Sequence, residues 1–206
     1  GSAVVMSEWQ DQVPAVLNAW YPGVEGGNAV ADVLFGDYNP SGKLPITYPI
    51  HEAQLPLNYS HKPTGRSDDY LNLTGEPLFP FGHGLSYTTF EYGKAEIDKK
   101  IMQQGESLRV RIPVTNTGNR SGAEIVQLYV SDLKSSLPRP KKELKGFKKV
   151  DLQPGESQIV EFEIDESKLS YFDDKKYAWV AEPGKFEILI GSSSSDIRSK
   201  VAFELE

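Results

Sequence analysis

The sequence predicts a mainly β protein: an antiparallel β-sandwich over residues 88–206, preceded by an incomplete α/β segment and a long loop. From about Thr88 onward apolar and polar residues alternate in short runs, whereas earlier in the chain the apolar residues cluster. Charge divides the chain at nearly the same place. Residues 1–90 carry 3 basic and 9 acidic side chains, and residues 91–206 carry 19 and 20. This shift in composition indicates two differently built parts.

Residues 1–50 have the pattern of short α/β elements. Ala3–Met6 and Leu44–Tyr48 are candidate strands, and Val13–Ala19 is a candidate helix. Ala29–Phe35 predicts a second helix with its apolar residues on one face, followed by a glycine where helices often end in a left-handed residue. Two or three strands cannot cover their own apolar surface. We therefore expect this part to be stable only by packing on the sandwich, on a partner chain or on a larger protein.

Residues 51–87 are predicted to be a connecting loop. Periodicity fades between Pro49 and Pro80, where Gly, Pro, Asn and Asp become frequent. Loops of this length are uncommon inside a compact chain, and those that occur tend to bind ligands or wrap a neighbour.

Residues 88–206 contain the alternating runs of a half-buried antiparallel sheet. The runs are Leu108–Val114, Val126–Val130, Val160–Ile164, Phe186–Ile190 and Val201–Leu205. Turn residues separate them: Asn116–Asn119, Pro154–Glu156, and Pro183 with Gly184. Ser192–Ser195 is expected to be another turn. Roughly seven short strands in this length fit an immunoglobulin-like sandwich, and the absence of cysteine makes fibronectin type III-like the better description.

Composition excludes several classes of function. The chain has no cysteine, so disulfides, thiolate metal sites and cysteine nucleophiles are excluded. A net charge of −7 gives no general attraction to nucleic acid or anionic membranes, and no apolar run approaches the ~20 residues of a membrane helix. The histidines His51, His61 and His83 are too widely spaced to predict zinc. Five residues instead of four separate Gly36 from Gly42, so no phosphate loop is predicted. We expect no metal and no cofactor.

Four longer segments carry a resemblance to a known family. Trp20–Pro45 resembles the C-terminal α/β domain of glycoside hydrolase family 3, and Pro80–Phe90 resembles the segment that leads into the last domain of that family. Arg139–Phe147 and Leu152–Glu156 are similar to its fibronectin type III-like domain. The resemblance covers nearly the whole chain in the order of the family. It implies that residues 1–50 are the C-terminal part of the α/β domain.

The resemblance also implies a chemistry and where it resides. Enzymes of this family are usually β-glucosidases or β-xylosidases that retain configuration, which requires two carboxyl groups about 5–5.5 Å apart. In the family the nucleophilic aspartate lies in an N-terminal barrel, and the acid/base glutamate lies upstream of the segment that Trp20 begins. Glu8 and Glu25 match no catalytic motif. We therefore expect no catalytic residue in this chain, which alone should be inactive, within a periplasmic or extracellular parent enzyme.

Three roles compete for such a chain. In the first, the sandwich and loop buttress the catalytic domains. Arg66, Asp68, Asp69 and Tyr70 of the loop then either contact the leaving-group sugar of the substrate or belong to a solvated loop that Arg66 anchors. In the second, the sandwich itself binds carbohydrate through the aromatic cluster Tyr171, Phe172, Tyr177 and Trp179, which would equally suit a strand pair and its core. In the third, the chain forms a homodimer through a strand edge or through the incomplete α/β part.

Overall fold

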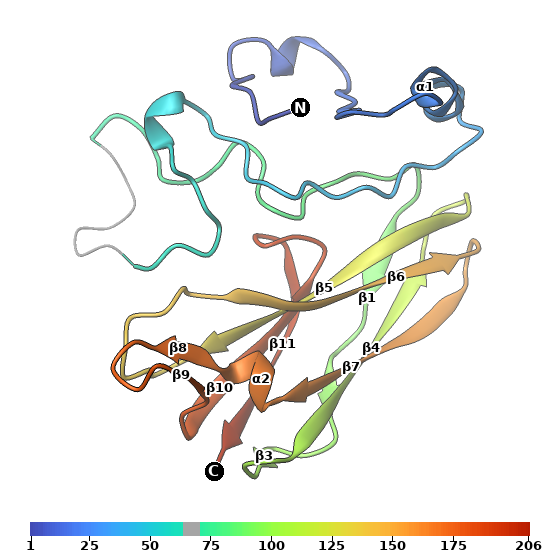
Figure 1. The fold of residues 1–206 in the computed structure, drawn as a ribbon. Coiled ribbons are helices and arrows are strands. Elements are labelled where there is room, and N and C mark those ends of the chain that lie inside the picture. The colour runs from blue at the N-terminus through green and yellow to red at the C-terminus, as the bar shows by residue number, and fades with distance from the viewer. Residues whose placement is uncertain (64–70) are drawn as a thin grey trace.

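The computed structural model describes residues 1–63 and 71–206 as a sandwich and a layer of mostly irregular chain along one end of it (Figure 1). The irregular layer is the N-terminal part. It contains the short 3-10 helices Gln10–Gln12 and Glu52–Gln54 and the helix α1, Gly26–Phe35. The sandwich begins at β1 and contains all eleven strands of the described chain. The mainly β fold class predicted from the sequence is confirmed.

Two large sheets and one hairpin make up the sandwich. One sheet contains β4 at its centre, paired on one side with β7 and on the other with two short strands: β1 (Phe90–Tyr92), β2 (Glu96–Ile97), β4 (Ser107–Asn116) and β7 (Ser157–Asp165). The other has the order β3 (Ile101–Met102), β11 (Ile197–Leu205), β10 (Gly184–Gly191), β5 (Gly122–Asp132) and β6 (Glu143–Leu152). Its β3–β11 pair is parallel. A short helix, α2 (Glu166–Leu169), leads into the separate hairpin of β8 (Tyr171–Asp173) and β9 (Ala178–Val180).

The core lies between the two sheets and is formed by the alternating runs. On β4 the even-numbered residues from Leu108 to Val114 are fully buried. Val126, Leu128 and Val130 of β5 face them, and all belong to one apolar cluster with residues of β7, β10 and β11. Burying each such side chain contributes about 1.5–3 kcal/mol, so the sandwich has its own core. All five predicted runs lie within strands.

The predicted turn at Pro154–Glu156 and the predicted serine turn are found, whereas Gly184 of the predicted Pro183–Gly184 turn is already the first residue of β10. Pro154 and Gly155 occupy the two central positions of the turn between β6 and β7, where Glu156 N–H donates to Gln153 C=O at 2.9 Å. Gly155 has φ of +77°, the left-handed value that the second central residue of a type II turn requires. The predicted serine turn joins β10 to β11.

Of the elements predicted in residues 1–50, only the second helix forms. α1 begins at Gly26, three residues earlier than expected, and ends at Gly36 with φ of +84°. Ala3–Met6 is not a strand, because no strand of the described chain pairs with it. Val13–Ala19 is not a helix. A helix this short is marginal in water unless its apolar face packs, and its apolar side chains are exposed here.

The predicted strand Leu44–Tyr48 is also wrong, although its backbone has partners. Tyr48 forms an isolated antiparallel bridge with Phe79. Leu44 N–H donates to His83 C=O, and Leu44 C=O accepts from Gly82 N–H, both at 2.8 Å. The segment therefore runs beside residues 78–84 without becoming a regular strand.

The alternation of apolar and polar residues did not predict strand β6. Gly146, Lys148 and Lys149 interrupt its apolar pattern, and a register shift opposite Leu128 and Tyr129 leaves Lys145 as an extra residue. Among residues 1–63 and 71–206, no helix is long and apolar enough to cross a membrane.

Candidate functional site

The residues proposed from the sequence to contact substrate, Arg66, Asp68, Asp69 and Tyr70, lie outside the described residues. What the structure does describe is the base of the loop that carries them, and the seam by which residues 39–63 and 71–88 dock on the sandwich. The two form one continuous site, built from side chains of both parts.

Gln54 joins the two legs of the long loop at its base. Its amide oxygen accepts from Ile50 N–H at 2.7 Å and from His51 N–H at 3.3 Å. Its amide nitrogen donates to the carbonyls of Thr74 and Glu76 at 2.8 and 3.0 Å. The Tyr48–Phe79 bridge closes the same base. Because the Gln54 side chain is buried, all four hydrogen bonds are sheltered from competing water.

Tyr59 fixes the first leg of the loop to the sandwich. Its ring stacks on Phe81 with centroids 4.3 Å apart and meets the edge of Tyr129 at 6.0 Å. Its hydroxyl accepts a hydrogen bond from Leu144 N–H at 3.0 Å. Leu144 lies at the bulge of the edge strand β6, so Tyr59 satisfies a backbone donor that an edge strand would otherwise leave to solvent.

Gln127 of β5 anchors the segment Pro80–Gly84 to the outer face of the larger sheet. Its amide nitrogen donates to Gly82 C=O at 3.0 Å and to Ser192 C=O at 2.7 Å, and Tyr129 donates its hydroxyl to the amide oxygen at 2.5 Å. Ser194 N–H adds a bond to Phe81 C=O at 2.9 Å. Gln127 and Tyr129 are buried, because this segment covers them.

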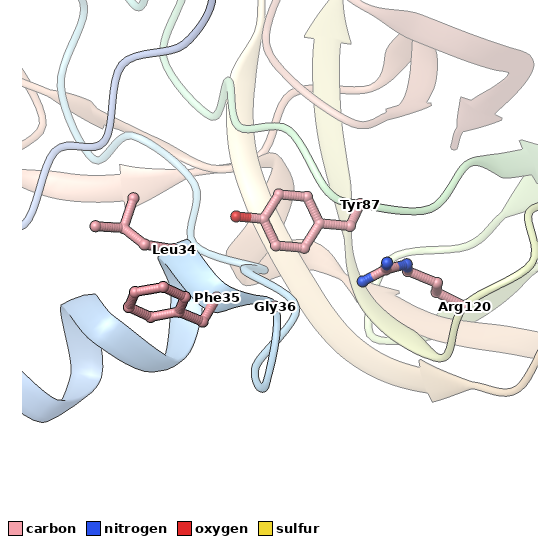
Figure 2. Close-up of a pocket in the computed structure, with 5 residues that line it drawn as sticks. All are labelled: Leu34, Phe35, Gly36, Tyr87 and Arg120. Carbon is pink, nitrogen blue, oxygen red and sulfur yellow. The ribbon is translucent and has the colours of Figure 1, made fainter.

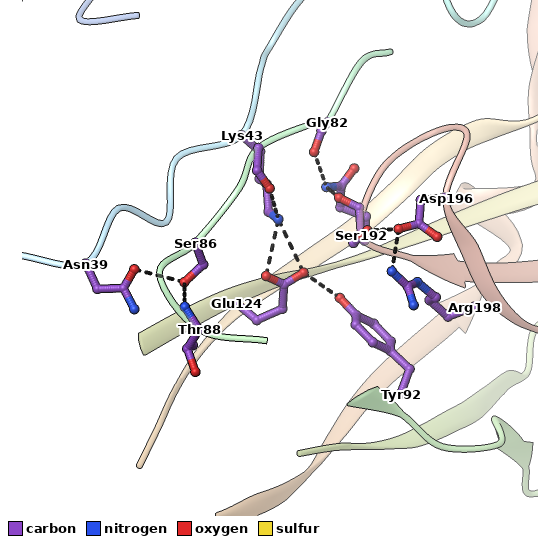
Figure 3. A network of polar contacts seen from close by, with 12 residues as sticks. Asn39, Lys43, Gly82, Ser86, Thr88, Tyr92, Glu124, Ser192, Asp196 and Arg198 are labelled. Atoms are coloured by element: carbon purple, nitrogen blue, oxygen red, sulfur yellow. Dashed lines mark hydrogen bonds and ion pairs between the residues drawn. The ribbon is translucent and has the colours of Figure 1, made fainter. Parts of the chain in front are cut away.

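A buried ion pair crosses the seam (Figure 3). The Lys43 ammonium lies 3.2 Å from a Glu124 carboxylate oxygen and donates to Gly84 C=O at 3.0 Å. Glu124 also accepts the Tyr92 hydroxyl at 2.8 Å. The Lys43 and Glu124 side chains are only 11% and 4% exposed. Burial, and next the negative charge of Glu124, raise the pKa of the Tyr92 hydroxyl far above its usual range, so Tyr92 stays a donor.

A second charged pair lies beside the first. Asp196 accepts from Arg198 and from the Ser192 hydroxyl, both at 2.7 Å, in the turn between β10 and β11. His83 stacks on Phe79 with centroids 5.1 Å apart. Burial, and secondarily the Lys43 charge, hold the pKa of His83 below its ordinary value, so the seam favours a neutral imidazole.

Asn39 ties the chain after α1 to the entry of the sandwich. Its side-chain oxygen accepts from the Ser86 hydroxyl at 2.9 Å and from Tyr87 N–H at 2.8 Å. Its amide nitrogen donates to Ser121 C=O at 2.9 Å. Asn39 belongs to the segment Trp20–Pro45, and Ser86 and Tyr87 belong to the segment Pro80–Phe90. These two segments, which carry the family resemblance, are therefore in contact although they are far apart in sequence.

An open hollow of about 430 Å³ lies between α1 and the β4–β5 turn. Figure 2 shows Leu34 and Phe35 on one side, Arg120 on the other and Tyr87 between them. Tyr87 donates its hydroxyl to Val33 C=O at 2.8 Å, which uses its polar atom. The ring of Phe35 is 85% exposed. The hollow is open, and its Leu34 and Phe35 side chains belong to the exposed apolar surface of residues 1–38.

That surface, the N-terminal apolar face, consists of exposed large apolar side chains in the first 38 residues: Val4, Val5, Trp9, Val13, Val16, Leu17, Tyr21, Val24, Leu34, Phe35 and Tyr38. Trp20 beside it is half-buried and meets the edge of Tyr48 at 6.5 Å. So many exposed large apolar side chains within 38 residues indicate that this part of the chain packs on another surface.

Glu25 and His51 each occupy the N-cap position of a helix. Glu25 is the N-cap residue of α1, and its carboxylate accepts from the Asn28 amide at 2.6 Å. His51 caps the short 3-10 helix, its Nδ1 accepting from Ala53 N–H at 3.0 Å. Among the described residues, no three His, Cys, Asp or Glu side chains converge as a metal would require.

Sequence reasoning missed the residues that build the seam. Glu124 and Gln127 carried a usable signal, since each is a polar residue with apolar neighbours on both sides in strand β5. Gln54 and Tyr59 carried none, because their partners lie about 20 to 85 residues away.

Comparison with known proteins follows the same division of the chain. The family model of the glycosyl hydrolase family 3 C-terminal domain matches residues 1–87, and that of the fibronectin type III-like domain matches residues 124–194.

Relatives match over the full length of this chain. A periplasmic beta-glucosidase of Salmonella typhimurium is 43% identical over 215 residues, covering 100% of this chain and 28% of that protein. A xylan 1,4-beta-xylosidase of Xylanibacter ruminicola is 42% identical over 95% of this chain and 22% of that protein. A mutant beta-glucosidase from Listeria innocua, solved in complex with laminaribiose, has a TM-score of 0.90 at 35% identity, over 98% of this chain and 29% of that one. The chain thus spans less than a third of each.

Proposed function

Because this chain belongs to glycoside hydrolase family 3 and corresponds to the C-terminal portion of its relatives, we propose that it buttresses the catalytic domains of a retaining β-glucosidase-type enzyme. In this proposal residues 1–50 complete the α/β domain, residues 51–87 connect, and residues 88–206 are the buttress. The two reactive carboxyl groups of the retaining mechanism belong to polypeptide outside this chain, and the chain alone does not hydrolyse glycosides.

The observation that carries the proposal is the N-terminal apolar face. Residues 1–38 expose large apolar side chains, whereas the sandwich buries its own core. An isolated domain would gain about 25 cal/mol for each Å² of this surface removed from water. The rest of the α/β domain is the occupant that the family membership supplies. The buried seam then holds that domain in a fixed position relative to the sandwich.

Assembly tests the proposal. We expect the chain to bind the separately produced upstream portion of its enzyme, and Phe35→Asp to weaken that binding at least about tenfold by placing a charge in the apolar interface. Phe147→Asp is the matched control. Phe147 is 65% exposed but lies on β6 of the sandwich, outside residues 1–38, so this variant should bind like the unchanged chain.

Calorimetry measures both affinities. Equal binding by the two variants would contradict the assignment of the face. A homodimer is the competing occupant. If light scattering gave twice the mass of one chain, and Phe35→Asp restored a single chain, the face would belong to self-association instead.

We also propose that Arg66, Asp68, Asp69 and Tyr70 reach an oligosaccharide at the rim of the catalytic site. The support is the clamped base of their loop, where Gln54 and Tyr59 hold both legs. In the complete enzyme, Tyr70→Ala should raise KM for oligosaccharides and leave kcat nearly unchanged, since it removes binding and not chemistry. An unchanged KM on every substrate tested would remove these residues from the site.

The parent enzyme is proposed to act in the periplasm or outside the cell. The support is the periplasmic beta-glucosidase of Salmonella typhimurium, which aligns with all of this chain. Fractionating cells that produce the complete enzyme would test this, and activity confined to the cytoplasm would contradict it.

A further inference from the structure

The β8–β9 hairpin has polar anchors on its underside and aromatic rings on its outer surface. Tyr171 donates its hydroxyl to Glu182 at 2.7 Å, and Glu182 also accepts from Ser136 N–H at 3.0 Å. The Arg139 guanidinium lies 5.4 Å from the centroid of the Tyr171 ring. The buried Asp173 carboxylate accepts from the Lys175 and Lys176 N–H groups at the turn. The hairpin is thus held firmly from beneath.

On the outer surface of the hairpin, large aromatic side chains are exposed to solvent instead of buried. Phe172 and Trp179 are directly opposite in the register and 50% and 72% exposed. Their rings meet edge to face with centroids 5.9 Å apart. Tyr177 at the turn is 84% exposed and has φ of +51°, a conformation rare for a bulky residue. Backbone held in this way tends to occur at functional sites.

The hairpin is remote from the N-terminal apolar face. In Figure 1 it lies at the opposite side of the molecule from α1. It lies instead at the end of the sandwich that the long loop reaches. Arg139 beneath the hairpin pairs with Glu143 at 2.6 Å, and the next residue, Leu144, is bonded to Tyr59 of the loop.

We propose that Phe172, Tyr177 and Trp179 form a secondary binding surface for a β-linked glucan chain, outside the catalytic domains. This proposal depends on the proposed function in one respect only, which is that the bound sugar is a β-linked glucan. Aromatic rings have flat apolar faces that suit the C–H faces of sugar rings, and the flanking Asp174, Lys175 and Lys176 can bond hydroxyl groups. Their mixed charges favour neither nucleic acid nor an anionic membrane.

The three tryptophans of the chain, Trp9, Trp20 and Trp179, provide an internal comparison. The 206-residue chain is titrated with cellotetraose and with laminaritetraose, and the three indole N–H signals are followed by NMR after assignment with single Trp→Phe variants. We expect the Trp179 signal to shift with a Kd on the order of 1 mM while the other two stay fixed. Maltotetraose, which has α-linkages, should bind more weakly.

Substitutions make the test specific. Trp179→Ala should weaken binding about tenfold, Trp179→Phe should retain most of it, and Phe147→Ala, an exposed aromatic on β6, should change nothing. The unchanged β4 and β7 amide signals of each variant verify its fold. No Trp179 shift at about 10 mM of either β-glucan overturns the proposal. So does equal binding of maltotetraose, or a chain dimer that Trp179→Ala dissociates.

Failure here is distinguishable from failure of the proposed function, because the titration uses no catalytic domain. If the Trp179 signal did not shift, but the chain still bound the upstream portion of its enzyme and Phe35→Asp weakened that binding, only the hairpin site would be ruled out.

Discussion

At the scale of single residues, the seam depends on polar side chains that are buried within an otherwise apolar strand. Glu124 shares the inner face of its sheet with Val150, its partner in the register, and is neutralised there by Lys43. Gln127 lies on the outer face, with its amide saturated by Gly82, Ser192 and Tyr129. A buried polar group without a partner costs about 1–3 kcal/mol, and more when it is charged. Each side chain is therefore a strong constraint on where Lys43 and the segment Pro80–Gly84 lie.

Removing one member of the buried pair should be costly. Lys43→Met leaves the Glu124 carboxylate buried without its cation, and we expect it to lower the free energy of unfolding by about 3 kcal/mol. Lys99→Met is the matched control. The Lys99–Glu106 pair is 2.8 Å long but is 35% and 47% exposed, so its loss should cost less than about 1 kcal/mol. Denaturant unfolding measures both, and equal losses would mean that Lys43 does not stabilise the seam.

At the scale of elements, the sequence predicted what depends on local pattern and failed where partners are distant. The alternating runs and the Pro154–Gly155 turn are confirmed, because period and turn chemistry act over a few residues. Ala3–Met6 and Val13–Ala19 are apolar enough for regular elements but find no partner in the described chain. For the same reason, the local sequence gives no indication that Gln54 joins two legs of a loop about 20 residues apart.

The Pro80–Gly84 segment provides an element-scale test. Gly82 has φ of +81°, and an added Cβ would lie 2.1 Å from the amide oxygen of Gln127. Gly105 has φ of +80° with no atom within 4 Å, so it shares the backbone strain without the clash. We expect Gly105→Ala to cost about 1 kcal/mol and Gly82→Ala at least about 2 kcal/mol more. Thermal unfolding of the two variants measures this difference.

Hydrogen exchange shows which backbone amides lose protection in the variant. In Gly82→Ala, protection should fall in residues 44–48 and 78–84 and remain in β4 and β7. Similar stability of the Gly82 and Gly105 variants would show that Gln127 does not hold this segment.

At the scale of the whole molecule, the two parts differ in how they bury apolar surface. The sandwich encloses a core of its own, whereas residues 1–38 present theirs outward. The seam joins them, so a domain packed on the N-terminal apolar face would be fixed relative to the sandwich and to the base of the long loop. The β8–β9 hairpin lies away from α1, so the glucan surface proposed there is separate from that helix.

The central claim is that this chain is a scaffold whose reactive carboxyl groups are supplied by other polypeptide. Hydrolysis of an aryl β-glucoside tests it most directly, measured on the purified chain alone and after mixing with the upstream portion of its enzyme. We expect no turnover above the uncatalysed rate for the chain alone, and turnover by the mixture. Turnover by the chain alone, persisting through repeated purification, would contradict it.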